Sequence, residues 1–109
     1  MSRPLYQPHA LTPEAVSAMP GAIVLDFGTE WCGHCAAARG RVDAALAAHP
    51  EITHLRIEDG RGRTLGRAFG VKLWPTLVFL RDGQERARCV RPQDDRGIEE
   101  ALVQIAPGV

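Results

Sequence analysis

The sequence predicts an α/β fold with a central mixed sheet of four to five strands and helices on both faces. The first half alternates short apolar runs with segments of helical periodicity, an order typical of parallel strands joined by covering helices. The second half contains a strong hairpin signal, Asp82-Gly83 between two extended runs, which adds antiparallel strands. The 109 residues suit a single domain over 1–109, with no internal repeat or linker.

The first predicted elements are a short helix and a buried strand. Thr12 suits the N-cap of a helix over 12–19, and Pro13 suits its first position. The run AIVLDF over 22–27 is apolar apart from Asp26, so we expect a strand buried on both faces. The possible fifth strand precedes the short helix, in a segment that mixes Pro, Gln, His and small residues.

The remaining elements follow from periodicity and turn residues. Apolar positions on one face predict a second helix, which Pro50 ends. An alternating strand, a glycine-rich turn with a short helix, the hairpin and an amphipathic helix come next. The predicted bounds are 36–49 for the helix with apolar positions Ala38, Val42, Ala45 and Leu46, 52–58 for the strand, 59–71 for the turn and short helix, 76–90 for the hairpin, and 94–105 for the closing helix, whose apolar side carries Ile98, Leu102 and Ile105.

The composition argues against some classes of partner. Hydrophobic residues make up 45% of the chain and charged residues 24%, and the formal net charge is zero. This balance does not favour nucleic acid or an anionic membrane. No long apolar run follows a basic N-terminus, so we expect no secretory signal, no membrane span and a cytoplasmic location. A mature chain whose signal had been removed would have the same sequence.

The stretch WCGHC, residues 31–35, contains two cysteines two residues apart. Structural disulfides are rare in the cytoplasm, so such a pair is expected to be catalytic or metal-binding. Zinc usually takes four ligands, but only Cys89 remains as a further cysteine and the histidines are scattered. His34 lies between the two cysteines, where it is badly placed to share a metal with both. We therefore expect no metal.

The cysteine pair is predicted to lie where a strand passes into a helix that starts near Cys32. The first amides of a helix lack internal partners, and the helix dipole favours negative charge there. A thiolate at Cys32 is therefore stabilised, whereas Cys35 lies one turn along, further inward, and stays protonated longer. One exposed thiolate that attacks and a second thiol that resolves the mixed disulfide are what dithiol exchange requires.

The chain resembles the thioredoxin family over nearly its whole length. The matching stretches are VLDFGTEWCGHC and FGVKLWPTLVFLRDG, together with the strand order. An aspartate before the cysteines, Trp-Cys-x-x-Cys at a helix start and a later x-Pro-Thr form a specific combination. The resemblance implies the thioredoxin fold and a disulfide oxidoreductase, with Cys32 as nucleophile and Cys35 as resolving cysteine. It also implies that Pro75 is cis beside the disulfide and that Asp26 is buried behind it.

The surroundings of the cysteines suggest further roles. Asp26 is the only charge in an apolar strand, which suits a base that acts on Cys35; the alternative is a structural aspartate paired with a cation. The backbone around residue 74 should pair with an extended substrate, as an added strand does. Trp31 suits packing and surface contact. The expected substrate-binding residues are Trp31, Gly33, His34, Trp74, Pro75 and Arg91.

Several positions differ from the family pattern. His34 stands where the family usually has proline, and Gly-His between the cysteines resembles protein disulfide isomerase. A histidine there can stabilise the Cys32 thiolate, which makes the disulfide a better oxidant. Gly28 replaces a tryptophan and Gly40 a helix-kinking proline, so we expect looser surroundings of the site. Trp74 replaces a smaller side chain and is expected either to grip substrate or to narrow its access.

Three further residues leave alternatives open. Arg91 replaces a glycine on the substrate-facing rim, where it either steers acidic partners or is a solvated strand end. Arg56 aligns with a lysine near the buried aspartate, and because arginine keeps its proton, we expect it to hold Asp26 ionised. Cys89 is either a small buried hydrophobe or a regulatory or intermolecular thiol.

The sequence therefore predicts a thiol–disulfide oxidoreductase that reduces protein disulfides. Its expected partners are disulfide-containing proteins and an electron donor resembling thioredoxin reductase, with no bound cofactor. Two alternatives stay open. His34 favours a disulfide oxidase or isomerase. Gly28, Trp74 and Arg91 alter the docking surface and favour a thioredoxin-fold binding or assembly module with incidental redox activity.

Overall fold

The computed structural model describes residues 11–106, and the predicted order of elements is confirmed within that range. The possible fifth strand, ahead of the first helix, lies outside the described residues. In chain order the elements are α1 (Pro13–Ser17), β1 (Ala22–Gly28), α2 (Gly33–Ala47), β2 (Thr53–Glu58), α3 (Leu65–Ala68), β3 (Thr76–Arg81), β4 (Gln84–Val90) and α4 (Asp95–Ile105).

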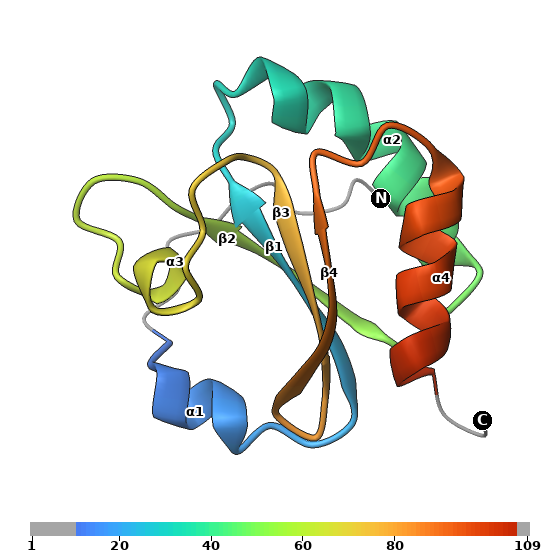
Figure 1. Ribbon diagram of the computed structural model, residues 1–109, viewed down its shortest axis with the longest axis horizontal. Coiled ribbons are helices and arrows are strands. Elements are labelled where there is room, and N and C mark those ends of the chain that lie inside the picture. Colours follow the sequence, from blue (N-terminus) through green and yellow to red (C-terminus); the bar gives the residue numbers. More distant parts are fainter. Residues whose placement is uncertain (1–10, 107–109) are drawn as a thin grey trace.

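Four strands of the described chain form one mixed sheet in the order β2-β1-β3-β4. β1 pairs parallel with β2 and antiparallel with β3, and β3 pairs antiparallel with β4. Helices α2 and α4 cover one face, and α1 and α3 lie on the other (Figure 1). The predicted mixed α/β sheet with helices on both faces is therefore confirmed.

Helix α1 begins at the capping residue that the sequence predicts, and α4 has an N-cap of the same kind. Thr12 Oγ1 accepts a hydrogen bond from Ala15 N–H at the start of α1, and Asp94 caps α4 through the N–H groups of Arg96 and Gly97. The predicted apolar positions of α2 and α4 are buried. Within residues 11–106, no helix has both the length and the apolar content needed to cross a bilayer.

Alternate residues of β1 serve two separate apolar clusters. All seven residues of the strand are buried, as the apolar run predicts. Val24 belongs to the cluster beneath α2 and α4, whereas Leu25 belongs to the cluster beneath α1 and α3. Because side chains of a strand alternate between faces, Asp26 points to the same face as Val24 and lies on the α2 side.

The β3–β4 hairpin turns at Asp82-Gly83, as predicted. These residues have φ angles of 51° and 80°, the left-handed values that a two-residue hairpin turn requires. Asp82 Oδ1 accepts a hydrogen bond from Gly21 N–H at 2.8 Å. A Cβ at Gly83 would collide with the backbone carbonyl of Ser17, so the close contact also requires glycine. The turn thereby ties the hairpin to the segment between α1 and β1.

Candidate active site

The two cysteines lie at the N-terminal end of α2. Cys32 is the N-cap, and its Sγ accepts a hydrogen bond from Cys35 N–H at 3.2 Å. Cys32 is 7% exposed and Cys35 is 1% exposed, so the predicted difference in depth is confirmed. All three cysteines are free thiols, and the structure thus describes the dithiol form. A helix amide therefore contacts the sulfur that is expected to attack.

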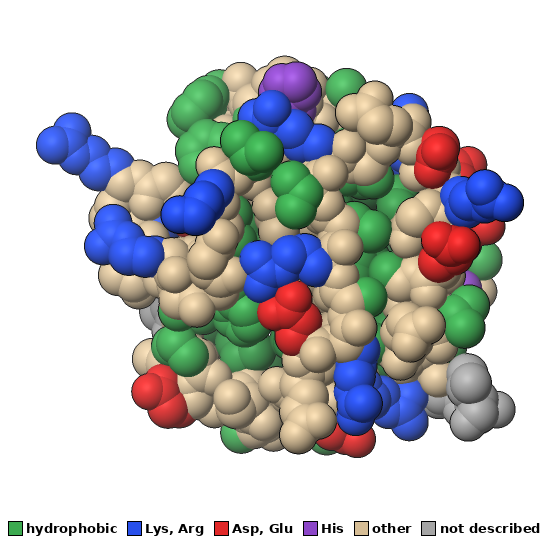
Figure 2. Space-filling view, viewed as in Figure 1, with side chains coloured by type: hydrophobic (Ala, Val, Ile, Leu, Met, Phe, Trp, Pro, Cys, Tyr) green, Lys and Arg blue, Asp and Glu red, His purple; other side chains and the backbone are tan. Residues whose placement is uncertain are grey.

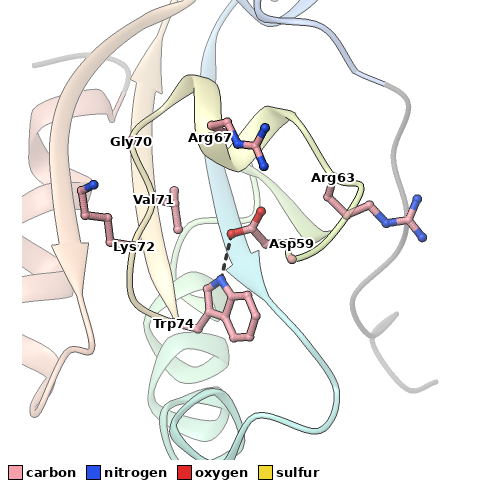
Figure 3. Close-up of a pocket in the computed structure, with 8 residues that line it drawn as sticks. Asp59, Arg63, Arg67, Gly70, Val71, Lys72 and Trp74 are labelled. Carbon is pink, nitrogen blue, oxygen red and sulfur yellow. Dashed lines mark hydrogen bonds between the residues drawn. The ribbon is translucent and has the colours of Figure 1, made fainter.

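Cys32 is less open than the sequence suggests, because Trp74 packs against both cysteines. The Trp74 indole N–H donates a hydrogen bond to Asp59 Oδ2 at 2.8 Å (Figure 3). Its ring meets Trp31 edge-on, with centroids 5.4 Å apart, and Trp31 itself is 78% exposed. Of the two roles expected for Trp74, this packing favours the narrowing of access, while Trp31 offers an open apolar surface beside it.

Arg91 braces the segment that carries Trp74 and Pro75. The bond between Trp74 and Pro75 is cis, as the family resemblance implies. Arg91 N–H donates to the Pro75 carbonyl at 2.9 Å, and Arg91 Nε donates to the Trp74 carbonyl at 2.8 Å. Its φ of 49° is left-handed, a conformation that the glycine usual in this family adopts easily. The Arg91 side chain therefore occupies one of the two hydrogen-bonding positions of the Trp74 carbonyl oxygen. An added substrate strand would pair with the same oxygen.

Two hollows lie beside this centre, and cations line both. The first, of about 380 Å³, is bounded by Trp74, and the second, of about 190 Å³, is bounded by His34. Figure 2 shows Lys and Arg side chains gathered over the α3 side of this face. In Figure 3 the Arg63 guanidinium points away from the first hollow; it pairs with Glu58 at 2.7 Å. The cations are Arg63, Arg67 and Lys72 in the first hollow and Arg41 and Arg91 in the second.

Asp26 belongs to a buried charged cluster. Its Oδ2 lies 3.0 Å from His54 Nε2 and 3.5 Å from Arg56 Nε, which confirms that Arg56 lies beside Asp26. Arg56 Nη2 donates to Asp43 Oδ1 on α2 at 2.6 Å. The side chains of Asp26, His54 and Arg56 are at most 3% exposed, whereas that of Asp43 is 34% exposed.

Three residues that contact the site were not predicted from the sequence. They are His54 and Asp43 in the buried charged cluster and Asp59 at the Trp74 indole. One signal was available for His54. Polar residues occupy every second position of THLRIE from residue 54 onward, which places His54 and Arg56 on one face of β2. The parallel register sets Arg56 opposite Asp26, so that face is the one that α2 covers. Asp43 contacts Arg56, and Asp59 contacts Trp74, only because a helix and a loop pack against other elements. Such contacts leave no pattern in the neighbouring sequence from which they could be predicted.

Comparison with known proteins identifies the family. The Thioredoxin family model matches residues 11–104. The chain belongs to the thioredoxin family. Thioredoxin of Chlamydia muridarum is 34% identical over 80 residues, which cover 73% of this chain and 78% of that protein. The structure of thioredoxin 2 from Pseudomonas aeruginosa PAO1 in its reduced form has a TM-score of 0.86 and 45% identity, and covers 95% of this chain and 96% of that chain.

The family and the Cys-x-x-Cys pair together establish the activity. The protein is a thiol–disulfide oxidoreductase that reduces protein disulfides, and the expected thioredoxin fold is confirmed. Protein disulfide-isomerase A2 of Homo sapiens is 37% identical over 87 residues, which cover 74% of this chain but 17% of that protein. The comparisons as a whole do not favour the oxidase, isomerase or binding-module alternatives.

Proposed function

We propose that this thioredoxin-family protein reduces disulfides of other proteins with Cys32 as the attacking thiol and Cys35 as the resolving thiol. The observation that carries the proposal is the hydrogen bond from Cys35 N–H to Cys32 Sγ at the N-cap of α2. The amide and the helix dipole stabilise negative charge on that sulfur. Cys35 lies one turn behind it, almost fully buried, and keeps its proton until the second exchange.

The reaction runs in two exchanges. The Cys32 thiolate attacks one sulfur of the substrate disulfide, and the other sulfur leaves as a thiolate that takes up a proton. Cys35 loses its proton and attacks Cys32 Sγ, and the second substrate sulfur leaves with the bonding pair. Two electrons thus pass to the substrate, and Cys32 and Cys35 form a disulfide. A dithiol donor resembling thioredoxin reductase returns the electrons in the cytoplasm.

Asp26 serves as the base for the resolving thiol. It is buried on the face of β1 that α2 covers, and the first turn of α2 carries Cys35. Arg56 Nε lies 3.5 Å from Oδ2 of this carboxylate, which in its ionised form can accept a proton. A carboxylate that takes up the proton of the resolving thiol would contribute through proton transfer in the transition state.

The substrate lies in an extended conformation along the Trp74–Pro75 segment, with Trp31 and His34 at its sides. A Cβ at Gly33 would meet nothing within 4 Å, so this position leaves open space beside Cys32 for a substrate backbone. The hollows bounded by Trp74 and His34 accept side chains that flank the substrate disulfide. Arg91 positions the Trp74 carbonyl rather than filling the groove.

Insulin reduction tests the proposed activity. With dithiothreitol as donor, the wild-type protein should accelerate precipitation of the insulin B chain, and Cys32→Ser should abolish that acceleration. Cys35→Ser should instead accumulate a covalent mixed disulfide with the substrate, visible by mass spectrometry, because the resolving thiol is missing. Activity that survives Cys32→Ser would contradict the proposal.

The reduction potential tests the direction of transfer. Equilibration in glutathione and dithiothreitol buffers, followed by tryptophan fluorescence, should give a value nearer the roughly −270 mV of thioredoxin than the roughly −180 mV of protein disulfide isomerase. His34→Pro should lower the potential, since the histidine no longer stabilises the Cys32 thiolate. A wild-type value above the glutathione pool would favour the oxidase or isomerase alternative instead.

A further inference from the structure

His54 is a buried imidazole that the mechanism above leaves unused. Its side chain is 2% exposed, and its Nε2 lies 3.0 Å from Asp26 Oδ2. An apolar residue at this position of β2 would extend the neighbouring apolar cluster, to which the paired Val24 belongs. Removing an imidazole from water has a cost that hydrogen bonding must offset. The Asp26 carboxylate accepts such a bond when Nε2 carries the proton.

The sheet register places His54 behind Asp26 as seen from the cysteines. Asp26 lies opposite Arg56, and His54 lies two residues earlier on the parallel strand, opposite Val24. Both strands run toward the edge of the sheet from which β1 continues to Cys32 and α2. Cys35, Asp26 and His54 therefore follow one another from the active-site end inward, on the face that α2 covers.

The charges around His54 come from three elements. β1 supplies the Asp26 carboxylate, and β2 supplies the Arg56 guanidinium. α2 supplies the Asp43 carboxylate, the Cys35 thiol and Arg39, whose buried Nε lies four residues from each of them along the helix. Among these groups Asp26 is the one in contact with the imidazole, at 3.0 Å. A positive charge on the imidazole would therefore act first on the Asp26 carboxylate.

We infer that His54 orients Asp26 and makes the resolving step of the reaction sensitive to pH. The inference rests on the proposed role of Asp26 as base. Neutral His54 donates its Nε2–H to Asp26 Oδ2 and so fixes the orientation in which the carboxylate takes the proton from the Cys35 S–H bond, whose electron pair stays on the sulfur. Protonation of His54 places a positive charge beside the carboxylate, so the carboxylate takes that proton less readily. His54 is thus a positioning residue that acts through Asp26.

Reaction with 5,5′-dithiobis(2-nitrobenzoate) separates the two exchanges. Attack by Cys32 releases one thionitrobenzoate at a rate that depends on reagent concentration. Attack by Cys35 on the resulting mixed disulfide releases a second at a rate that does not. Stopped-flow absorbance resolves the two phases, and all variants are made in a Cys89→Ala background so that only the active pair reacts. The concentration-independent phase is measured across the range in which imidazoles titrate, about pH 5 to 8.

His54→Gln is the decisive variant, because its amide can donate to Asp26 but cannot become charged. Its second phase should match wild type within about twofold near pH 8 and exceed it about tenfold near pH 5.5, where imidazolium would weaken the base. His54→Leu, which has no donor, should be slower throughout by about tenfold. In an Asp26→Asn background the effect of His54→Gln should vanish, since the imidazole acts only through the carboxylate.

Two outcomes would overturn the role of His54. One is a second-phase pH profile of His54→Gln that superimposes on wild type. The other is a mismatch in the unmutated protein. It would be seen if the ¹⁵N signals of the His54 imidazole titrate in a different pH range from the fall in the second-phase rate at low pH. Failure of the wild-type protein to reduce insulin would instead contradict the proposed function. Insulin reduction with superimposed profiles would leave that function standing and remove only the inference about His54.

Discussion

The sulfur of Cys89 has surroundings unlike those of the active pair. Cys89 lies in β4, half-buried against the apolar cluster beneath α2 and α4, and its S–H donates to the Gly97 carbonyl at 3.4 Å. Burial, and next the nearby Glu100 carboxylate, raise the pKa of the Cys89 thiol above its ordinary value. These contacts favour the small buried hydrophobe among the two roles expected from the sequence, because a raised pKa makes a thiol less reactive near neutral pH.

We expect Cys89 to lose its contribution to stability at alkaline pH. Because burial raises its folded-state pKa above the ordinary 9.0, the native protein keeps a proton that the unfolded chain releases. The contribution is complete below the unfolded pKa and is lost as pH rises through the folded pKa. Urea unfolding of wild type and Cys89→Ala at neutral pH and at about pH 10 measures it. At the higher pH the free energy of unfolding of wild type should fall relative to that of Cys89→Ala. The same difference between the two proteins at both pH values would contradict the expectation.

Single residues differ in how well the sequence predicts them. Cys32 and Cys35 could be placed because their spacing and the strand-to-helix junction are local features, and both lie where expected. Asp26 is recognisable as one charge in an apolar strand. His54 required the register of a parallel strand, which is set by packing across a long connection rather than by neighbouring residues.

Two glycines within helices show that the effect of a side chain on helix stability depends on the atoms packed against that position. Gly40 lies within α2, and a Cβ there would meet nothing within 4 Å. Gly66 lies within α3, and a Cβ there would collide with the Asp59 carboxylate, which holds the Trp74 indole. Both glycines carry the same backbone entropy cost in a helix, so substitution by alanine separates that cost from the contact.

We expect Gly40→Ala to stabilise the protein and Gly66→Ala to destabilise it. The first should raise the free energy of unfolding by about 0.5–1 kcal/mol, since alanine is the better helix former and the space is open. The second should lower it by about 1–3 kcal/mol, because the carboxylate must move. Urea unfolding measures both, and Gly66→Ala should also change Trp74 fluorescence in the native state. Equal effects of the two substitutions would refute the contact at Gly66.

Secondary-structure elements could be predicted from the sequence where neighbouring residues alone determine their conformation. The apolar run of β1, the cap at Thr12 and the turn at Asp82-Gly83 each specify their own conformation, and each was predicted. The cover that Trp74 forms over the cysteines could not be predicted in this way. It depends on a hydrogen bond to Asp59, which lies in a different loop.

The two apolar clusters to which β1 contributes lie on opposite faces of one sheet, so we expect a single unfolding transition. β1 contributes Val24 to one cluster and Leu25 to the other. Loss of packing on one face of the strand therefore also disrupts the cluster on its other face. Urea unfolding followed by far-ultraviolet circular dichroism, which reports helices on both faces, should coincide with that followed by Trp31 and Trp74 fluorescence. The common slope should be about 1–3 kcal/mol/M. A fluorescence change that came first would show that the active-site end opens separately, contrary to one domain over 1–109.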